Sequence, residues 1–159
     1  MSIEMSLVGV RVELSSNQPI VLLREANGER FLPIFIGGFE AQAIAFALQE
    51  MVPPRPLTHD LMRDLLTAAE LDVRRIVITE LRDSTFYADL VVVRNEDELT
   101  VSARPSDAIA LAVRAGCPIF AEEEVLEKAG ICLQDDEEES QVEQFRTFLE
   151  GIKPEDFKL

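Results

Sequence analysis

The chain has 159 residues, of which 47% are hydrophobic, and a formal net charge of −15. This length fits one domain, and no apolar run approaches the roughly 18 residues of a membrane-spanning helix, so we expect a cytoplasmic protein without membrane contact. So negative a chain is not expected to bind nucleic acid non-specifically through Lys and Arg. The two cysteines, Cys117 and Cys132, lack the CxxC spacing of a zinc site or a disulfide framework.

The charge is uneven, because residues 1–121 carry −6 of it and residues 122–159 carry −9. We therefore expect a domain over 1–130 and an acidic appendage over 131–159. Five consecutive acids, Asp135 to Glu139, repel one another and favour a solvated loop. The alternative is that this acidic segment selects a protein partner through its charge. After them, Val142, Phe145, Leu149 and Ile152 have helical spacing, which predicts an amphipathic helix that packs on the body or on a neighbouring subunit.

The first third of the chain predicts three strands and a helix. Alternating apolar residues at 8–14 indicate a half-buried strand, and 19–24 is a second apolar run. Asn27-Gly28, a strong hairpin signal, separates this run from a third strand at 31–36. Small and apolar residues spaced at i, i+3, i+4 and i+7 predict a helix over 39–50.

The middle of the chain begins with three prolines, at 53, 54 and 56, which favour an extended connection. Thr58 is a suitable N-cap for a helix that ends near Leu71. Within that helix, the leucines at 61, 65 and 66 are expected to face inward.

The rest of the domain predicts an antiparallel meander, because three β-rich segments at 73–81, 85–93 and 98–102 are separated by polar turns. Pro105 suits the first turn of a helix that ends at Gly116. A strand at 118–121 and a helix at 122–129 follow. Without regular βαβ alternation, this order predicts an α+β fold with a largely antiparallel mixed sheet and packed helices.

Polar residues gather at the starts of three predicted helices, where unpaired backbone N–H groups favour anions. At the first, Gly37-Gly38 allows a sharp turn before Glu40. The turn lacks the Lys and Ser or Thr of a nucleotide-binding loop. Glu40 either complements the helix dipole or holds a metal or an attacking water.

At the second helix start, His59, the single histidine of the chain, lies beside Asp60 and follows Arg55. Histidine serves as a general base near neutral pH, and a carboxylate can orient it or bind a divalent cation. Side chains at i and i+1 of a helix point about 100° apart, so Asp60 is not expected to orient His59 directly. The alternative is a polar helix cap.

At the third helix start, Arg104-Pro105-Ser106-Asp107 precedes a very apolar helix. Either Asp107 complements the dipole while Arg104 pairs with a nearby carboxylate, or Arg104 binds a phosphate while Asp107 coordinates a metal. The spacing alone leaves both open.

Several motifs follow one another along the chain. They are Leu32-Pro33-Ile34-Phe35-Ile36-Gly37, Glu40-Ala41, Arg55-Pro56-Leu57-Thr58-His59-Asp60-Leu61, Thr85-Phe86-Tyr87-Ala88 and Arg104-Pro105-Ser106-Asp107-Ala108-Ile109-Ala110-Leu111-Ala112. In this order and spacing they resemble the signature of the bifunctional nuclease (BFN) domain family over about residues 5–130.

The resemblance implies DNase and RNase activity. Our first hypothesis is therefore a nuclease assisted by Mg²⁺ or Mn²⁺. The expected metal ligands are Glu40, Asp60 and Asp107, and the expected proton-transfer group is His59. The expected phosphate ligands are Arg55, Arg104 and Ser106. Sequences of the family commonly have an acid two residues before the motif arginine, where this chain has Ser102; if that acid binds a metal, activity is weakened here.

Two further expectations follow from charge and surface. The net charge favours a rival hypothesis, a non-enzymatic regulatory or assembly module that binds a protein partner or a small anion through the same polar residues. Many apolar strands and a detached amphipathic helix favour homo-oligomerisation, with a dimer as the default.

Overall fold

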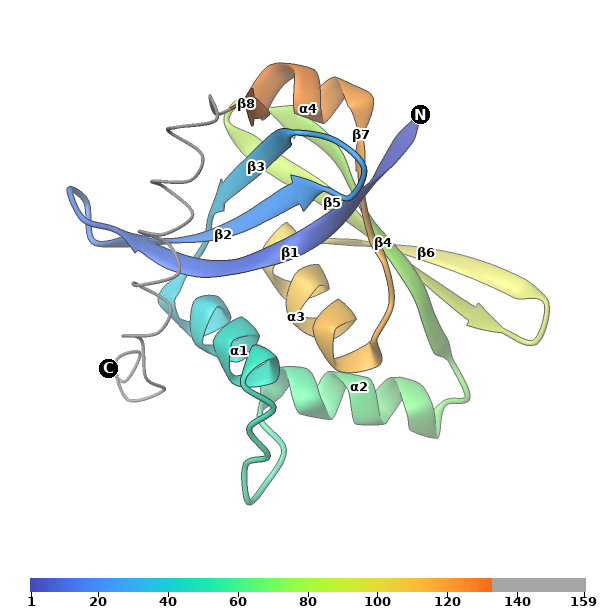
Figure 1. The fold of residues 1–159 in the computed structure, drawn as a ribbon. Helices are drawn as coiled ribbons and strands as arrows, with labels where there is room; N and C mark the ends of the chain where they lie inside the picture. The colour runs from blue at the N-terminus through green and yellow to red at the C-terminus, as the bar shows by residue number, and fades with distance from the viewer. Residues whose placement is uncertain (133–159) are drawn as a thin grey trace.

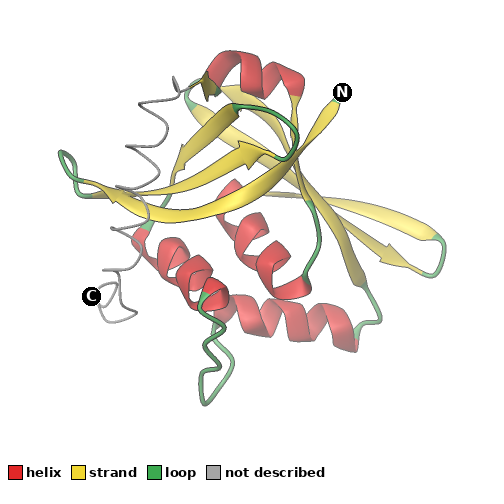
Figure 2. Ribbon diagram, viewed as in Figure 1, coloured by secondary structure: helices red, strands yellow, loops and turns green. Residues whose placement is uncertain are grey.

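A computed structural model describes residues 1–132 of the chain. The strands form one sheet, and the helices pack beside it (Figure 1). Strands and helices follow one another along the chain without regular alternation, so the fold is α+β (Figure 2). The strands are β1 (Ser2–Glu13), β2 (Gln18–Glu25), β3 (Arg30–Phe35), β4 (Asp72–Arg82), β5 (Thr85–Arg94), β6 (Asp97–Ala103), β7 (Ile119–Glu122) and β8 (Ile131–Cys132). The helices are α1 (Gly38–Leu48), α2 (Thr58–Ala68), α3 (Pro105–Ala115) and α4 (Glu123–Ala129).

All the strands named above belong to one mixed sheet with the order β6-β5-β4-β7-β1-β2-β3-β8. The meander β4-β5-β6 and the meander β1-β2-β3 are antiparallel, and β7 joins them by pairing parallel to β4 and antiparallel to β1. The predicted α+β class with a largely antiparallel mixed sheet is therefore confirmed.

Helix α3 is the centre of the core. Its residues 108–112 are all buried, and it contacts α1, α2, β4 and β5. Apolar residues from α1, α4 and both meanders complete the same cluster. Figure 1 shows α1 and α2 beside α3, while α4 lies at the opposite end of the molecule. The polar starts of α1, α2 and α3 are thus held by a shared apolar core.

Most element boundaries agree with the prediction, including the hairpin at Asn27-Gly28 and the helix that begins at Pro105. Gly116 ends α3 with a φ of 71°, a left-handed conformation that favours glycine. The first strand begins at Ser2, earlier than predicted, because its N-terminal part pairs with β7. The two-residue β8 was not predicted. The acidic segment and the terminal amphipathic helix lie outside the described residues.

The prediction for α2 was wrong in two respects. Leu61 and Leu65 are 51% and 60% exposed, whereas the buried residue of this helix is His59. Of the three leucines predicted to face inward, Leu66 does pack against the core. The N-cap is Leu57 and not Thr58, and the Asp60 carboxylate accepts the Leu57 N–H. Polar contacts of His59 and Asp60 with α3 set the rotation of α2, and this rotation leaves two leucines on the surface.

No helix within residues 1–132 has the length and apolar character needed to cross a membrane.

Candidate functional site

The polar starts of helices α1, α2 and α3 lie side by side in the structure. Glu40 lies in the first turn of α1, His59 is the second residue of α2, and Asp107 is the third residue of α3. Arg104 is the N-cap of α3. These four residues form one connected group, which we call the Arg104 cluster.

Arg104 joins two carboxylates. Its Nη2 lies 2.8 Å from Glu40 Oε1, and its Nε donates to Asp107 Oδ2 at 2.9 Å. These contacts, that with Asp107 first and that with Glu40 second, raise the pKa of Arg104 above its usual value. The Arg104 side chain is nevertheless 65% exposed, so it is the most accessible charge in the cluster.

Asp107 uses its second oxygen for His59. Oδ1 lies 2.9 Å from His59 Nε2, and His59 is only 7% exposed. One carboxylate therefore positions both the arginine and the histidine. The sequence predicted that Asp60 would not orient His59, and the structure gives that role to Asp107.

Gly37 provides space for the cluster. Its backbone is extended, with a φ of −78°, so no left-handed conformation requires glycine here. A Cβ on Gly37 would instead collide with the Glu40 carboxylate. By contrast, a Cβ on Gly38 would meet nothing within 4 Å. The absent side chain at Gly37 lets Glu40 fold back towards Arg104.

Asp60 belongs to a different contact. It accepts a hydrogen bond from Arg114 Nε at 2.8 Å and another from the Leu57 N–H at 3.1 Å. Burial raises the pKa of Asp60, but these two hydrogen bonds and the positive charges of Arg114 and Arg63 together outweigh burial and hold the pKa below its ordinary value of 3.8. Asp60 thus fastens the start of α2 to the end of α3.

Arg114 was not among the predicted site residues. Its side chain is only 5% exposed, and it also donates to the carbonyl oxygens of Ala43 in α1 and Ala110 in α3. It therefore ties together the three helices that carry the Arg104 cluster. The available signal was its position in the last turn of α3, where a cation complements the helix dipole.

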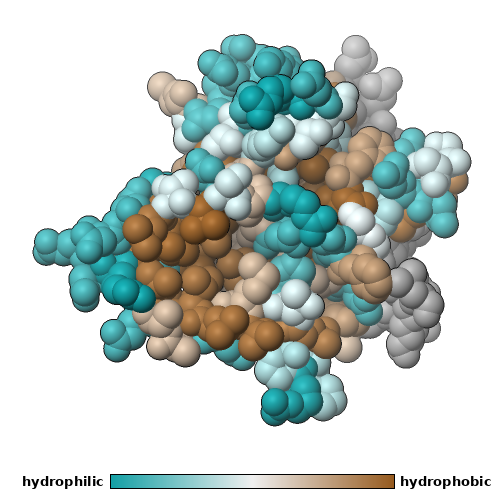
Figure 3. Space-filling view, turned by 180° about the vertical axis from the view of Figure 1, so that it is seen from behind, coloured by the Kyte–Doolittle hydropathy of each residue, from teal (hydrophilic) through white to brown (hydrophobic). Residues whose placement is uncertain are grey.

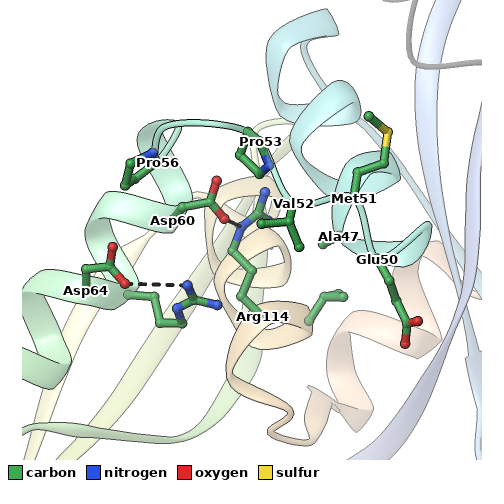
Figure 4. Close-up of a pocket in the computed structure, with 11 residues that line it drawn as sticks. Ala47, Glu50, Met51, Val52, Pro53, Pro56, Asp60, Asp64 and Arg114 are labelled. Carbon is green, nitrogen blue, oxygen red and sulfur yellow. Dashed lines mark hydrogen bonds and ion pairs between the residues drawn. The ribbon is translucent and has the colours of Figure 1, made fainter.

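A cavity of about 400 Å³ adjoins this second contact and not the Arg104 cluster. Figure 4 shows Asp60 and Arg114 on one side of it and the chain from Met51 to Pro53 on the other. Glu40, Arg104 and Asp107 do not line it.

The three predicted metal ligands do not come together. Glu40 and Asp107 share Arg104, while Asp60 binds Arg114. Within residues 1–132, no group of three or more His, Cys, Asp or Glu side chains is arranged to hold a metal ion. The donor set as placed here does not fit one common divalent-cation site, and we derive no chemical step through such an ion.

The two other predicted phosphate ligands lie in different surroundings. Arg55 is exposed in the connection between α1 and α2, whereas Ser106 is 5% exposed at the second position of α3. Ser102, which stands where the family commonly has an acid, is exposed in β6, two residues before Arg104. Of the predicted phosphate ligands, Arg104 is therefore the one that is both exposed and held in position.

The motifs that meet at the Arg104 cluster are those of a known domain. The chain belongs to the bifunctional nuclease domain family, whose model matches residues 21–134. It is 52% identical over 163 residues to an uncharacterized protein of Mycobacterium tuberculosis, with 98% of each chain covered.

Two rice proteins are more distant relatives. Bifunctional nuclease 1 of Oryza sativa subsp. japonica is 30% identical over 103 residues, which are 63% of this chain and 31% of the rice protein. Bifunctional nuclease 2 of the same plant is 26% identical over 115 residues, 70% of this chain and 35% of the rice protein. The matched region thus spans about a third of either rice protein.

Proposed function

We propose that this protein hydrolyses phosphodiester bonds of DNA, RNA or both at the Arg104 cluster. The observation that carries the proposal is the convergence of Glu40, His59, Arg104 and Asp107 from three helices. The family's name and the names of the rice relatives point to the same chemistry.

Phosphate binding is assigned to Arg104. Its Nε and Nη2 are occupied by the two carboxylates, and its Nη1 has no hydrogen bond with the described residues. A guanidinium held in this way is pre-oriented, so it loses little conformational freedom when it binds a phosphate oxygen. The adjacent N-termini of α1 and α3 add partial positive charge for the same anion.

Proton transfer is assigned to the carboxylates and the histidine. Glu40 accepts a proton from the attacking water, whose oxygen forms the new bond to phosphorus. The bond from phosphorus to the leaving oxygen then breaks, and that oxygen receives a proton through the His59–Asp107 pair. Because His59 is buried, its proton reaches the leaving oxygen either after a small opening of α2 or by a path through Asp107.

The first test compares wild type with Asp107→Ala, purified identically, on single-stranded and duplex DNA and RNA with Mg²⁺, Mn²⁺ or EDTA. The matched control is Asp64→Asn, which removes an exposed carboxylate from α2 outside the cluster. We expect cleavage by wild type and the control, and a loss of at least about 100-fold in folded Asp107→Ala. Equal traces in all three preparations would indicate a contaminant and refute the proposal. The EDTA arm decides whether a metal is needed.

A second candidate function is a regulatory or assembly module that binds a protein partner or a small anion. It is favoured by the charge of the cluster, in which two carboxylates already neutralise Arg104. This candidate predicts no cleavage in any arm, and saturable binding of a partner that Arg104→Ala weakens. Metal-dependent turnover that Asp107→Ala abolishes would argue against it.

A further inference from the structure

Strand β6 is an open edge of the sheet. It is the last strand of the order and pairs only with β5 among the described residues. It is seven residues long, and its pairing with β5 has no bulge. Its first six residues are all exposed. The opposite edge differs, because β8 has only two residues and α4 precedes it directly. Long, regular edges are usually shielded, since their unpaired backbone groups accept another strand.

The exposed side chains of β6 are also apolar on one face. Leu99 and Val101 are 51% and 52% exposed, and they lie beside the buried Val92 and Leu90 of β5. They therefore extend the apolar face of the sheet beyond the area that the helices cover.

Helix α2 adds a second row of exposed leucines at the border of this face. Leu57, Leu61 and Leu65 follow one another at intervals of four and are 43%, 51% and 60% exposed. Arg94, at the β5–β6 turn, donates to the carbonyl oxygen of Ala69 just after α2, which places the end of the helix beside the hairpin. Figure 3 shows the apolar surface gathered over this side of the sheet and along α2.

We propose that β6 pairs antiparallel with β6 of a second copy of this chain and forms a dimer with one continuous sheet. The strand is complementary to itself when Thr100 lies opposite the partner's Thr100. Leu99 then lies opposite the partner's Val101, while Asp97 and Glu98 lie opposite the partner's Ala103 and Ser102. No acid faces an acid, which matters for a chain with a net charge of −15.

The same arrangement covers the leucines of α2. In an antiparallel pair, directly opposed residues point to one face, so Leu99 and Val101 of both copies form one apolar row on the helix side. The two α2 helices then flank this row from opposite sides and bury Leu61 and Leu65 against it. Arg104 directly follows β6, so the two Arg104 clusters lie on the same face of the dimer.

The test measures the mass of the full chain by analytical ultracentrifugation in about 0.15 M salt, which screens the net charge. We expect wild type at twice the chain mass of 17.8 kDa and Val101→Lys at the mass of one chain. The matched control is Leu14→Lys, an equal change at an 86% exposed residue of the β1–β2 turn, which is expected to remain a dimer. A monomeric wild type, or a dimeric Val101→Lys, would overturn the proposal.

A cross-link tests the register. In a chain with Cys117 and Cys132 changed to alanine, Thr100→Cys is expected to form an intermolecular disulfide, because opposed Cα atoms lie about 4.5–5.5 Å apart. Ser102→Cys, two residues along the same face, is expected to form none. Absence of the Thr100→Cys cross-link, or equal cross-linking of both variants, contradicts the pairing.

Discussion

His59 Nε2 and Asp107 Oδ1 lie 2.9 Å apart, although 48 residues separate them in the sequence. This contact joins the start of α2 to the start of α3, and Asp60 and Arg114 join the start of α2 to the end of α3. Two polar contacts therefore position α2 on α3, and two of its leucines remain exposed. The same contacts that hold the helix place His59 and Asp107 beside Arg104.

Removal of Asp107 is expected to release the histidine. In wild type, the His59 Nε2–H donates to the Asp107 carboxylate and is shielded from water, since His59 is buried. In Asp107→Ala, we expect faster exchange of this proton with water and a stability loss of about 1–3 kcal/mol from an unpaired buried group. Nitrogen-detected NMR measures this directly, because the chain has a single histidine. An unchanged imidazole signal in the variant would show that Asp107 does not hold His59.

A substitution in the turn before α1 is expected to disturb the Arg104 cluster and to leave the stability of the fold nearly unchanged. Gly37→Ala is expected to push the Glu40 carboxylate away from Arg104, since the new Cβ occupies the space of that carboxylate. Only the end of a flexible side chain must move, so the free energy of unfolding should change by less than about 1 kcal/mol. Cleavage or anion binding should fall about tenfold or more.

The matched control for this variant is Gly38→Ala. A Cβ at Gly38 meets nothing within 4 Å, and alanine favours the first turn of α1. This control is expected to keep its activity and its stability. Equal activity of both variants would mean that the position of Glu40 does not matter.

The contact between Asp60 and Arg114 is expected to stabilise the fold. Asp60→Asn removes the charge that faces an arginine side chain only 5% exposed, and loss of one partner of such a pair costs about 3 kcal/mol. Asp64→Asn, four residues later on the same helix, breaks an exposed pair with Arg63 and should cost less than about 1 kcal/mol. Urea unfolding of the two variants measures the difference. If both cost the same, Asp60 is not a structural anchor.

The sequence predicted the strands and helices because their periodicity and turn residues are local signals. Pro105 and Gly116 bound α3 as predicted, and Asn27-Gly28 forms the predicted hairpin. The inward positions of Leu61 and Leu65 were predicted wrongly, because leucines at helical spacing indicate the core unless a tertiary contact turns them outward. The contact between His59 and Asp107 is such a contact, and no local pattern contains it.

The candidate site was predictable as a set of helix starts but not as a set of contacts. Glu40, His59 and Asp107 stand at predicted helix starts and carry polar groups suited to chemistry, and the fold brings all three together. The sequence predicts Asp60 as a member of the same site, because it lies beside His59 at the start of α2. The Asp60 side chain is not part of that group, because it accepts a hydrogen bond from Arg114, 54 residues away in the sequence.

The lowered pKa of Asp60 predicts the pH dependence of its contribution to stability. The folded protein holds this carboxyl below the ordinary value of 3.8, so the unfolded chain binds its proton more readily. The stabilisation is therefore fully present above about pH 5 and is lost as the pH falls below 3.8 through the lowered pKa.

Urea unfolding of wild type and Asp60→Asn between pH 7 and 3 measures this dependence. We expect the difference in unfolding free energy to be constant down to about pH 5 and to shrink below it, because protonated aspartic acid and asparagine are both uncharged. The difference between wild type and Asp64→Asn should stay small throughout. A difference for Asp60→Asn that does not shrink at low pH would show that the ion pair with Arg114 is not what stabilises this end of α2.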